Sequence, residues 1–329
     1  MFVKVVWALG LVLVLLLAGC TAKKAENKTG NAAPEPGKGT ANDLPSAGGT
    51  QPGSAATGIE EPGASTTPAI STGFVFGIEY GVPGLAKAFK KTGAHAVKFT
   101  PALVWWKNIQ KEESASYDWS AVDAHVREYQ EAGYDSMQLL LTSGSPWASI
   151  DGKDLLPKNF APKQEFEDEY VEFVKAAVER YDLDGVDDMP GLEHAVNEWG
   201  VEREFTAYFP GSGQDYVRVL KLAFPAIKEA NPNARVMLNA LLMWDIFQGN
   251  PSEGEIEKRF KNPLNGKRKD LTDIPVLLDA HAYFDVIDIH SLSDYTEIPS
   301  TVKWLRREMD RRGTQKDIFI GDAFPMSPL

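Results

Sequence analysis

Cysteine and positive charge are both scarce in this chain, and each shortage excludes a class of protein. Its 329 residues include a single cysteine, Cys20, so a disulfide framework and a thiolate metal site are both excluded. Lys and Arg number 34 against 46 Asp and Glu, for a net charge of −12. A fold this acidic repels phosphate backbones, and we therefore expect no nucleic-acid partner.

The chain also lacks the motifs of several enzyme classes. It has no G-x-G-x-x-G turn and no P-loop, which argues against dinucleotide and nucleoside-triphosphate binding. It has no H-x-H, H-E-x-x-H or nucleophile-elbow pattern, which leaves a metallohydrolase or a serine esterase without support. An acidic cluster, Asp182, Asp184, Asp187 and Asp188, lacks the spacing of an EF-hand loop. We expect a solvated loop there, and neither a metal nor a cofactor.

Long apolar runs are missing as well, apart from Val5–Leu17, whose 13 residues are too few to span a bilayer. Lys4 precedes this run, and Leu17-Ala-Gly-Cys20 closes it. A basic start, an apolar core and small residues at the cut are typical of a secretory signal peptide over residues 1–20. The closing residues resemble the lipobox of bacterial lipoproteins. That resemblance implies lipidation of Cys20 and anchoring to the cell-envelope membrane, facing outside the cytoplasm; an ordinary signal peptide with a chance cysteine is the alternative.

Residues 21–72 are rich in Ala, Gly, Pro, Ser, Thr and Asn and have almost no large apolar side chains. Such a segment cannot bury enough surface to offset the entropy of ordering it, so we predict a disordered linker. Globular composition begins at residue 73, and a folded domain is expected over residues 73–329.

In this domain short apolar segments alternate with amphipathic helical patterns. We predict strands at 74–78, 94–99, 136–142, 192–196, 234–240, 284–290 and 317–322. Helices are predicted at 85–89, 118–129, 165–181, 211–230 and 301–312. Seven apolar strands separated by helices, without a glycine-rich dinucleotide turn, favour an α/β protein of the (β/α)8 TIM-barrel class. The chain ends after strand seven, so we expect a truncated barrel that lacks strand eight and exposes two apolar edges.

The fourth predicted strand carries the most informative residues. It ends in Asn197-Glu198, and a carboxylate at the C-terminal tip of a barrel strand lies where such enzymes keep their chemistry. We therefore predict that Glu198 is a general acid/base. The alternative is an ion-pair residue at the strand end.

The motifs that carry a family resemblance are spread along the domain: Tyr117–Trp119, 131–133, 180–191, Asn197-Glu198, Asp215-Tyr216, 226–236 and 284–290. In this order they resemble clan A glycoside hydrolases, with families 39 and 42 the nearest, over about residues 74–322. The resemblance implies a (β/α)8 barrel in which Asn197 hydrogen-bonds a sugar 2-hydroxyl and Glu198 is the acid/base. It also implies a nucleophilic carboxylate at the end of strand seven, where this chain has Asp322.

Hydrolysis of a glycosidic bond needs two carboxyl groups. One protonates the leaving oxygen, and the other attacks the anomeric carbon or activates a water. Asp322 is one methylene shorter than the Glu of the family, which withdraws its carboxylate by roughly 1 Å, and a misplacement of that size costs about 10²-fold. A strand cap, a salt-bridge residue and an inverting arrangement across a wider gap are the alternatives for Asp322.

Residues predicted to bind the sugar end other strands. His290 ends strand six. It binds a sugar hydroxyl, orients a carboxylate or has a purely structural role. Tyr295 follows strand six and is a further candidate. Glu79 ends strand one. Flat rings suit the apolar faces of pyranoses, and the aromatic candidates after strands two to five are Trp105, Trp106, Trp147, Trp199 and Trp244.

Together these features predict a lipid-anchored glycoside hydrolase that cleaves oligo- or polysaccharides by a retaining mechanism. A non-catalytic carbohydrate-binding lipoprotein with a degenerate barrel is the alternative, which Asp322 and the missing strand favour.

Overall fold

The computed structural model describes residues 75–151, 159–243, 246–262, 269–292 and 296–323. Cys20 and the predicted linker lie outside these residues, so the signal peptide, the lipid anchor and the linker remain predictions. None of the described helices is both long and apolar enough to cross a membrane.

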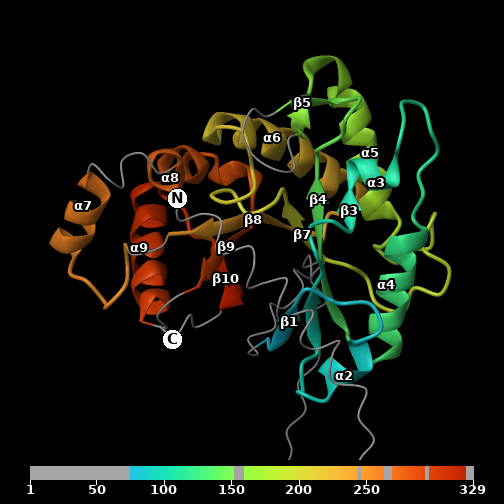
Figure 1. Ribbon diagram of the computed structural model, residues 1–329, viewed down its shortest axis with the longest axis horizontal. Coiled ribbons are helices and arrows are strands. Elements are labelled where there is room, and N and C mark those ends of the chain that lie inside the picture. The colour runs from blue at the N-terminus through green and yellow to red at the C-terminus, as the bar shows by residue number, and fades with distance from the viewer. Residues whose placement is uncertain (1–74, 152–158, 244–245, 263–268, 293–295, 324–329) are drawn as a thin grey trace, which may run out of the picture. The chain divides into compact units, whose positions relative to one another are not determined.

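Seven parallel strands form the wall of a barrel (Figure 1). Their order is β1 (Gly77–Glu79), β2 (Ala96–Lys98), β4 (Ser136–Thr142), β7 (Glu198–Val201), β8 (Arg235–Leu242), β9 (Val286–Ser291) and β10 (Asp317–Ala323). Within the described residues β10 does not pair with β1. The barrel is therefore open where an eighth strand would close it, as the sequence predicts.

Helices connect the strands and cover the outside of the barrel (Figure 1). They are α2 (Ala86–Lys90), α4 (Ser120–Glu131), α5 (Glu167–Glu179), α6 (Gly213–Ala230), α8 (Lys269–Asp279) and α9 (Glu297–Arg311). Apolar residues such as Phe173 of α5 and Trp199 of β7 form the core between helices and strands. Alternate residues of each strand face the other way, and several of these are buried polar groups, including Lys98, Gln138 and Asp288.

Six of the seven predicted strands and all five predicted helices are confirmed to within a few residues. The fourth strand is the exception, because β7 begins at Glu198 and the segment 192–196 is not a strand. The elements that the sequence analysis missed include β3 (Val104–Trp105), α3 (Trp106–Ile109), the hairpin of β5 (Ser149–Asp151) and β6 (Asn159–Pro162), α7 (Glu253–Lys261) and α8 (Lys269–Asp279).

Helix α6 begins with a reciprocal capping box. The Asp215 N–H donates to the Ser212 hydroxyl at 3.2 Å, and the Ser212 N–H donates to the Asp215 carboxylate at 2.8 Å. We expect Ser212→Ala to lower the free energy of unfolding by about 1 kcal/mol, measured by urea unfolding. Ser116→Ala, at an exposed serine outside any helix, is the matched control and should change it by less than about 0.5 kcal/mol. Equal effects of the two substitutions would contradict the capping role.

Candidate active site

Glu198 lies at the beginning of β7 and not at its end. It accepts a hydrogen bond from Arg235 at 3.1 Å, and Arg235 also binds Asp317, the first residue of β10, at 2.5 Å. Chemistry in a (β/α)8 barrel belongs to the C-terminal ends of the strands, whereas their N-terminal ends support stability. The prediction that Asn197-Glu198 ends a strand is therefore wrong, and so is the predicted pairing of Glu198 with Asp322 at the end of β10.

Asn197 is held at the same N-terminal end. Its carbonyl accepts from the Arg235 N–H at 2.7 Å, and its side-chain oxygen accepts from the Asn231 amide at 3.2 Å. The preceding apolar residues anchor a loop, since the N–H of the buried Val196 donates to the Tyr181 carbonyl at 2.7 Å. Apolar loop anchors and a buried strand have the same residue pattern, which explains the misplaced strand.

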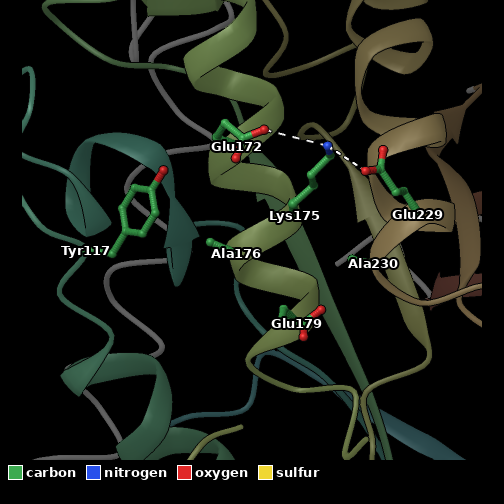
Figure 2. A pocket seen from close by; sticks show the side chains of 7 residues that line it. All are labelled: Tyr117, Glu172, Lys175, Ala176, Glu179, Glu229 and Ala230. Carbon is green, nitrogen blue, oxygen red and sulfur yellow. Dashed lines mark hydrogen bonds and ion pairs between the residues drawn. The ribbon is translucent and has the colours of Figure 1, made fainter. Parts of the chain in front are cut away.

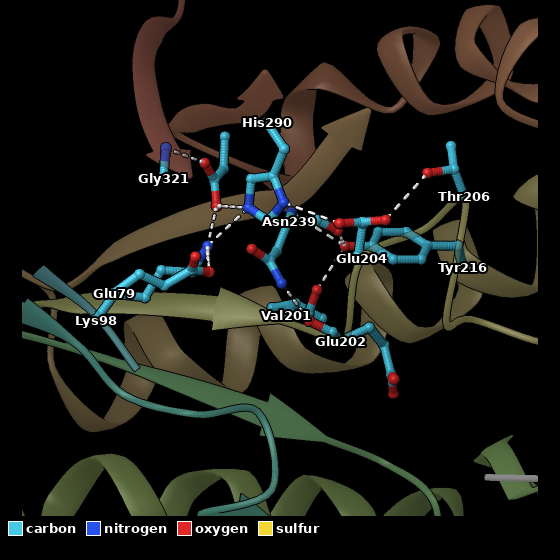
Figure 3. A network of polar contacts seen from close by, with 11 residues as sticks. Glu79, Lys98, Val201, Glu202, Glu204, Thr206, Tyr216, Asn239, His290 and Gly321 are labelled. Atoms are coloured by element: carbon cyan, nitrogen blue, oxygen red, sulfur yellow. Dashed lines mark hydrogen bonds and ion pairs between the residues drawn. The ribbon is translucent and has the colours of Figure 1, made fainter. Parts of the chain in front are cut away.

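Two carboxylates that the sequence analysis missed follow β7 at its C-terminal end. Glu202 is fully buried, and its Oε1 accepts from the Ser143 N–H at 2.8 Å. Its φ of 64° marks a tight turn, and the Asn239 side-chain amide donates to its carbonyl at 2.6 Å. These contacts with the neighbouring β4 and β8 fix the turn, and the turn brings Glu204 toward His290 (Figure 3). We call the region around Glu204 and His290, at the C-terminal ends of the strands, the barrel mouth.

His290 and Lys98 connect Glu204 to the barrel interior (Figure 3). His290 Nδ1 is 2.9 Å from Glu204 Oε2, and its Nε2 is 2.9 Å from Lys98 Nζ. Lys98 Nζ also lies 3.0 Å from Asp288 and 3.4 Å from Glu79. An ammonium group has three N–H donors, and beside a neutral His290 these three contacts use all of them. Lys98 thereby joins β1, β2 and β9 at the mouth.

The same contacts determine which nitrogen of His290 carries a hydrogen. In a neutral ring Nε2 accepts from the Lys98 ammonium, so the hydrogen is on Nδ1 and points at Glu204; a protonated ring has a hydrogen on both nitrogens. Burial lowers the pKa of His290, but hydrogen bonds to Asp288 and Glu204 outweigh burial and the charge of Lys98 and raise it to about 9. Nδ1 has a hydrogen in both protonation states of His290, so it donates to Glu204 in both. Glu204 therefore accepts this hydrogen bond, as a carboxylate does.

Asp322 reaches the mouth because β10 contains a bulge. The register between β10 and β9 shifts by one residue between Ile320 and Asp322. The N–H of the intervening Gly321 donates to Asp288 Oδ1 at 2.9 Å, and a Cβ on Gly321 would lie 2.3 Å from that oxygen. Only glycine permits this approach, and the extra residue turns Asp322 toward Glu79.

Glu79 and Asp322 are neighbouring carboxyl groups at the ends of β1 and β10. Burial raises the pKa of Glu79; the Lys98 ammonium lowers it, the charge of Asp322 raises it, and the result is about 7. A second carboxyl group nearby disfavours ionisation of the first. The mouth therefore combines Glu79, which keeps its proton up to about pH 7, with the hydrogen-bond acceptor Glu204.

Three of the tryptophans predicted to contact a sugar, Trp106, Trp147 and Trp199, pack in or against the core of the described structure. Trp106 and Trp199 are fully buried in the core, so the prediction that they contact a sugar is wrong. Trp147 packs edge-on against Trp106 and donates to the Gln110 carbonyl at 3.2 Å. These rings stabilise the helix–strand packing.

Trp105 differs from the other tryptophans, since it ends β3 beside the C-terminal end of β4. It is 9% exposed, and Lys107 Nζ lies 3.6 Å from its ring centroid. Contact of Trp105 with a sugar stays a prediction. Trp244 and Tyr295 lie outside the described residues, so their predicted roles stay predictions too.

The acidic loop after α5 has the form expected of a solvated turn. Asp182, Asp184 and Asp188 each bring a carboxylate oxygen within 4.8 Å of the others. Asp188 accepts hydrogen bonds from the N–H groups of Leu183, at 2.9 Å, and Gly185, at 2.8 Å. These carboxylates cap the backbone of their own loop, and the expectation that they hold no metal stays a prediction.

A hollow of about 350 Å³ lies between the C-terminal parts of α5 and α6 (Figure 2). Its charged groups pair with one another, since Lys175 lies 2.9 Å from Glu229 and 3.6 Å from Glu172. Barrel helices run antiparallel to the strands, so this hollow is at the opposite end of the barrel from the mouth.

No protein-family model and no curated protein matches the sequence. Solved structures match the fold. A glucosidase from Croceicoccus marinus aligns with a TM-score of 0.51 and 15% identity, over 75% of this chain and 50% of the glucosidase chain. The fold is that of a (β/α)8 barrel. The predicted barrel class, which this chain shares with glycosidases, is thereby confirmed.

Two further structures align less closely. A GH39 β-xylosidase from Caulobacter crescentus has a TM-score of 0.47 and 15% identity, over 77% of this chain and 54% of its own. BuGH86, solved in complex with neoagarooctaose, has a TM-score of 0.45 and 16% identity, over 74% of this chain and 42% of its own. The chain spans about half the length of the solved structures it matches. Likeness at these identities concerns the fold, and any mechanism rests on the residues at the mouth.

Proposed function

We propose that this protein is a glycoside hydrolase whose proton donor is the Glu79–Asp322 pair and whose anionic carboxylate is Glu204. One observation carries the proposal: Lys98 lies 3.4 Å from Glu79 and 2.9 Å from His290, and His290 lies 2.9 Å from Glu204, so carboxyl groups that follow different parts of the chain meet at the mouth. Burial raises the pKa of Tyr80, and the charges of Glu79, Asp322 and Glu204 raise it further, which is consistent with this arrangement. The fold match to a glucosidase is consistent with this function.

In the proposed step the carboxyl pair gives its proton to the glycosidic oxygen as the bond from that oxygen to the anomeric carbon breaks. The Glu204 carboxylate then has two possible roles. If it bonds to the anomeric carbon, a covalent intermediate forms that water hydrolyses, and the configuration is retained as the sequence predicts. If it takes a proton from an attacking water, the configuration inverts. The anomer formed first, read by proton NMR, distinguishes the two roles.

Glu79→Gln tests the proton donor. The amide has no acidic proton, so we expect kcat on alkyl glycosides to fall by about 10²- to 10³-fold. A dinitrophenyl leaving group departs without protonation, so the loss on that substrate should be less than about tenfold. Wild-type activity on alkyl glycosides should decline as pH rises through about 7, where Glu79 loses its proton, and the variant should lack this decline.

Equal losses on the two leaving groups would contradict the donor role of Glu79. Glu113→Gln, at an exposed glutamate away from the strands, is the matched control and should leave both rates unchanged. Binding of oligosaccharides without turnover of any aryl glycoside would favour the non-catalytic alternative. The short side chain of Asp322 supports that alternative.

A further inference from the structure

Two exposed tyrosines border the mouth. Tyr80 directly follows Glu79 at the end of β1 and is 49% exposed. Tyr208 follows Glu204 by one turn and is 42% exposed. Neither hydroxyl hydrogen-bonds to another described residue. The contacts from Glu79 through Lys98 and His290 to Glu204 join the residues that precede the two rings (Figure 3).

Tyr80 is held in an unfavourable backbone conformation. Its φ of 53° lies in the left-handed region, which a bulky side chain rarely adopts. The following N–H, of Gly81, donates to the Lys98 carbonyl at 3.3 Å, which ties this turn to β2. Strain of this kind is retained where a side chain is needed in one position. Here it keeps an aromatic ring at the rim of the mouth.

Tyr208 is held just as firmly by different contacts. Its N–H donates to the Glu204 carbonyl at 2.9 Å and closes the turn. Phe205 and Phe209, on either side of it in this turn, are buried and pack edge-on against Tyr216. The backbone of Tyr208 is therefore anchored while its ring remains exposed, so a ligand that covers the ring orders only side-chain torsions and no loop.

We propose that Tyr80 and Tyr208 form a sugar-binding subsite that takes an uncharged pyranose by its apolar ring face. The proposal rests on the function proposed above and adds the substrate class. Aromatic rings pack against the C–H face of a pyranose, which is the contact that two exposed, fixed rings offer. Burial, together with the charges of Glu79 and Glu204, raises the pKa of both tyrosines, so their hydroxyls stay protonated and able to donate to sugar oxygens.

The charges at the mouth exclude acidic sugars. Carboxyl groups outnumber basic groups there: Glu79, Glu202, Glu204, Asp288 and Asp322 against Lys98, Arg203 and His290. The Lys98 ammonium already contacts three groups of the mouth, Asp288, His290 and Glu79. A uronate or a sulfated sugar would add negative charge with no free ammonium to pair it, and should be rejected.

Equilibrium binding tests the subsite without relying on turnover. The probes are non-hydrolysable methyl thioglycosides of gluco, galacto, manno and xylo configuration and the corresponding glucuronide, titrated calorimetrically into the full chain. We expect at least one neutral probe to bind and the glucuronide to bind at least about tenfold more weakly. Tyr80→Ala and Tyr208→Ala should each weaken binding of the neutral probe about tenfold, and the matching Phe variants should stay within about threefold of wild type.

Phe76→Ala is the matched control, since it removes an exposed aromatic ring before β1, at the opposite end of the barrel. It should bind like wild type. The subsite is overturned if no neutral probe binds, if the Ala variants bind like wild type, or if the Phe variants lose as much as the Ala variants.

Turnover of aryl glycosides, measured on the same proteins, separates this inference from the proposed function. Binding that depends on both rings, in a chain without turnover, upholds the subsite and rejects the hydrolase. Turnover with an unchanged KM in both Ala variants upholds the hydrolase and rejects the subsite.

Discussion

Replacing Glu204 by Gln is expected to abolish glycoside hydrolysis, with a fall in kcat of about 10⁴-fold or more. The amide oxygen can still accept the hydrogen bond from His290 Nδ1, so the shape of the mouth is kept. The loss therefore reports the missing negative charge opposite the reacting carbon. Initial rates on nitrophenyl glycosides measure it.

A Glu→Gln substitution at the N-terminal end of β7 is the matched control. Glu198→Gln alters an ion pair with Arg235 at the N-terminal end of β7, and its activity should stay within about threefold of wild type. The opposite result, with activity lost in Glu198→Gln and kept in Glu204→Gln, would reject the present assignment and restore the one predicted from the sequence.

Glu204→Ala extends this test to the role of the carboxylate. The substitution leaves room for a small anion, so added azide should restore turnover of a dinitrophenyl glycoside. The azide nitrogen bonds to the anomeric carbon as the phenolate leaves, which gives a glycosyl azide. Rescue by azide in Glu204→Ala, and no rescue in Glu198→Ala, is the expected pattern.

Lys98→Met is expected to lower the free energy of unfolding by about 3–5 kcal/mol at neutral pH. Methionine has a similar length but leaves the fully buried Asp288 without the ammonium that lies 3.0 Å away. Burial by itself raises the pKa of Asp288, and Lys98 with His290 holds it below its usual value. In wild type this pair therefore adds stability above the unfolded-state pKa of Asp288, and that stability is lost as pH falls through the lower folded-state pKa.

In the variant burial still raises the pKa of Asp288, and only His290 is left to oppose it. The stability that the Lys98 pair adds above the unfolded-state pKa of Asp288 is therefore missing. The deficit against wild type should be largest at neutral pH and should shrink as pH falls through the folded-state pKa of Asp288 in wild type. Urea unfolding at several pH values measures it.

Lys111→Met makes the same change in an exposed ion pair. Lys111 lies 3.7 Å from Asp118, and the two side chains are 73% and 52% exposed, so water screens the pair and the expected loss is below about 1 kcal/mol. Combining Lys98→Met with Asp288→Asn should recover part of the deficit, because no buried charge is left unpaired. Equal losses in Lys98→Met and Lys111→Met would mean that the buried ammonium does not stabilise the mouth.

Local patterns in the sequence were sufficient to predict the barrel. The segment at β4 has the apolar Met137, Leu139 and Leu141 on one face and is buried on both, as a parallel strand covered on both sides requires. In the helical segments between strands, apolar residues recur at helical spacing, and this pattern can be recognised from each segment alone. The sequence also contained a signal for the mouth, because Glu198, Gly200 and Glu202 alternate as the inward-facing positions of a barrel strand do.

The geometry of the mouth depended on contacts that no local pattern encodes. Pairing of β7 with β4 and β8 begins at Glu198, and this register assigns Glu198 to one end of the barrel and Glu204 to the other. The bulge at Gly321 exists because its N–H meets Asp288 of another strand, and that bulge turns Asp322 toward Glu79. The strand and helix order thus follows from each segment alone, whereas the meeting of the carboxyl groups follows from hydrogen bonds between segments far apart in the chain.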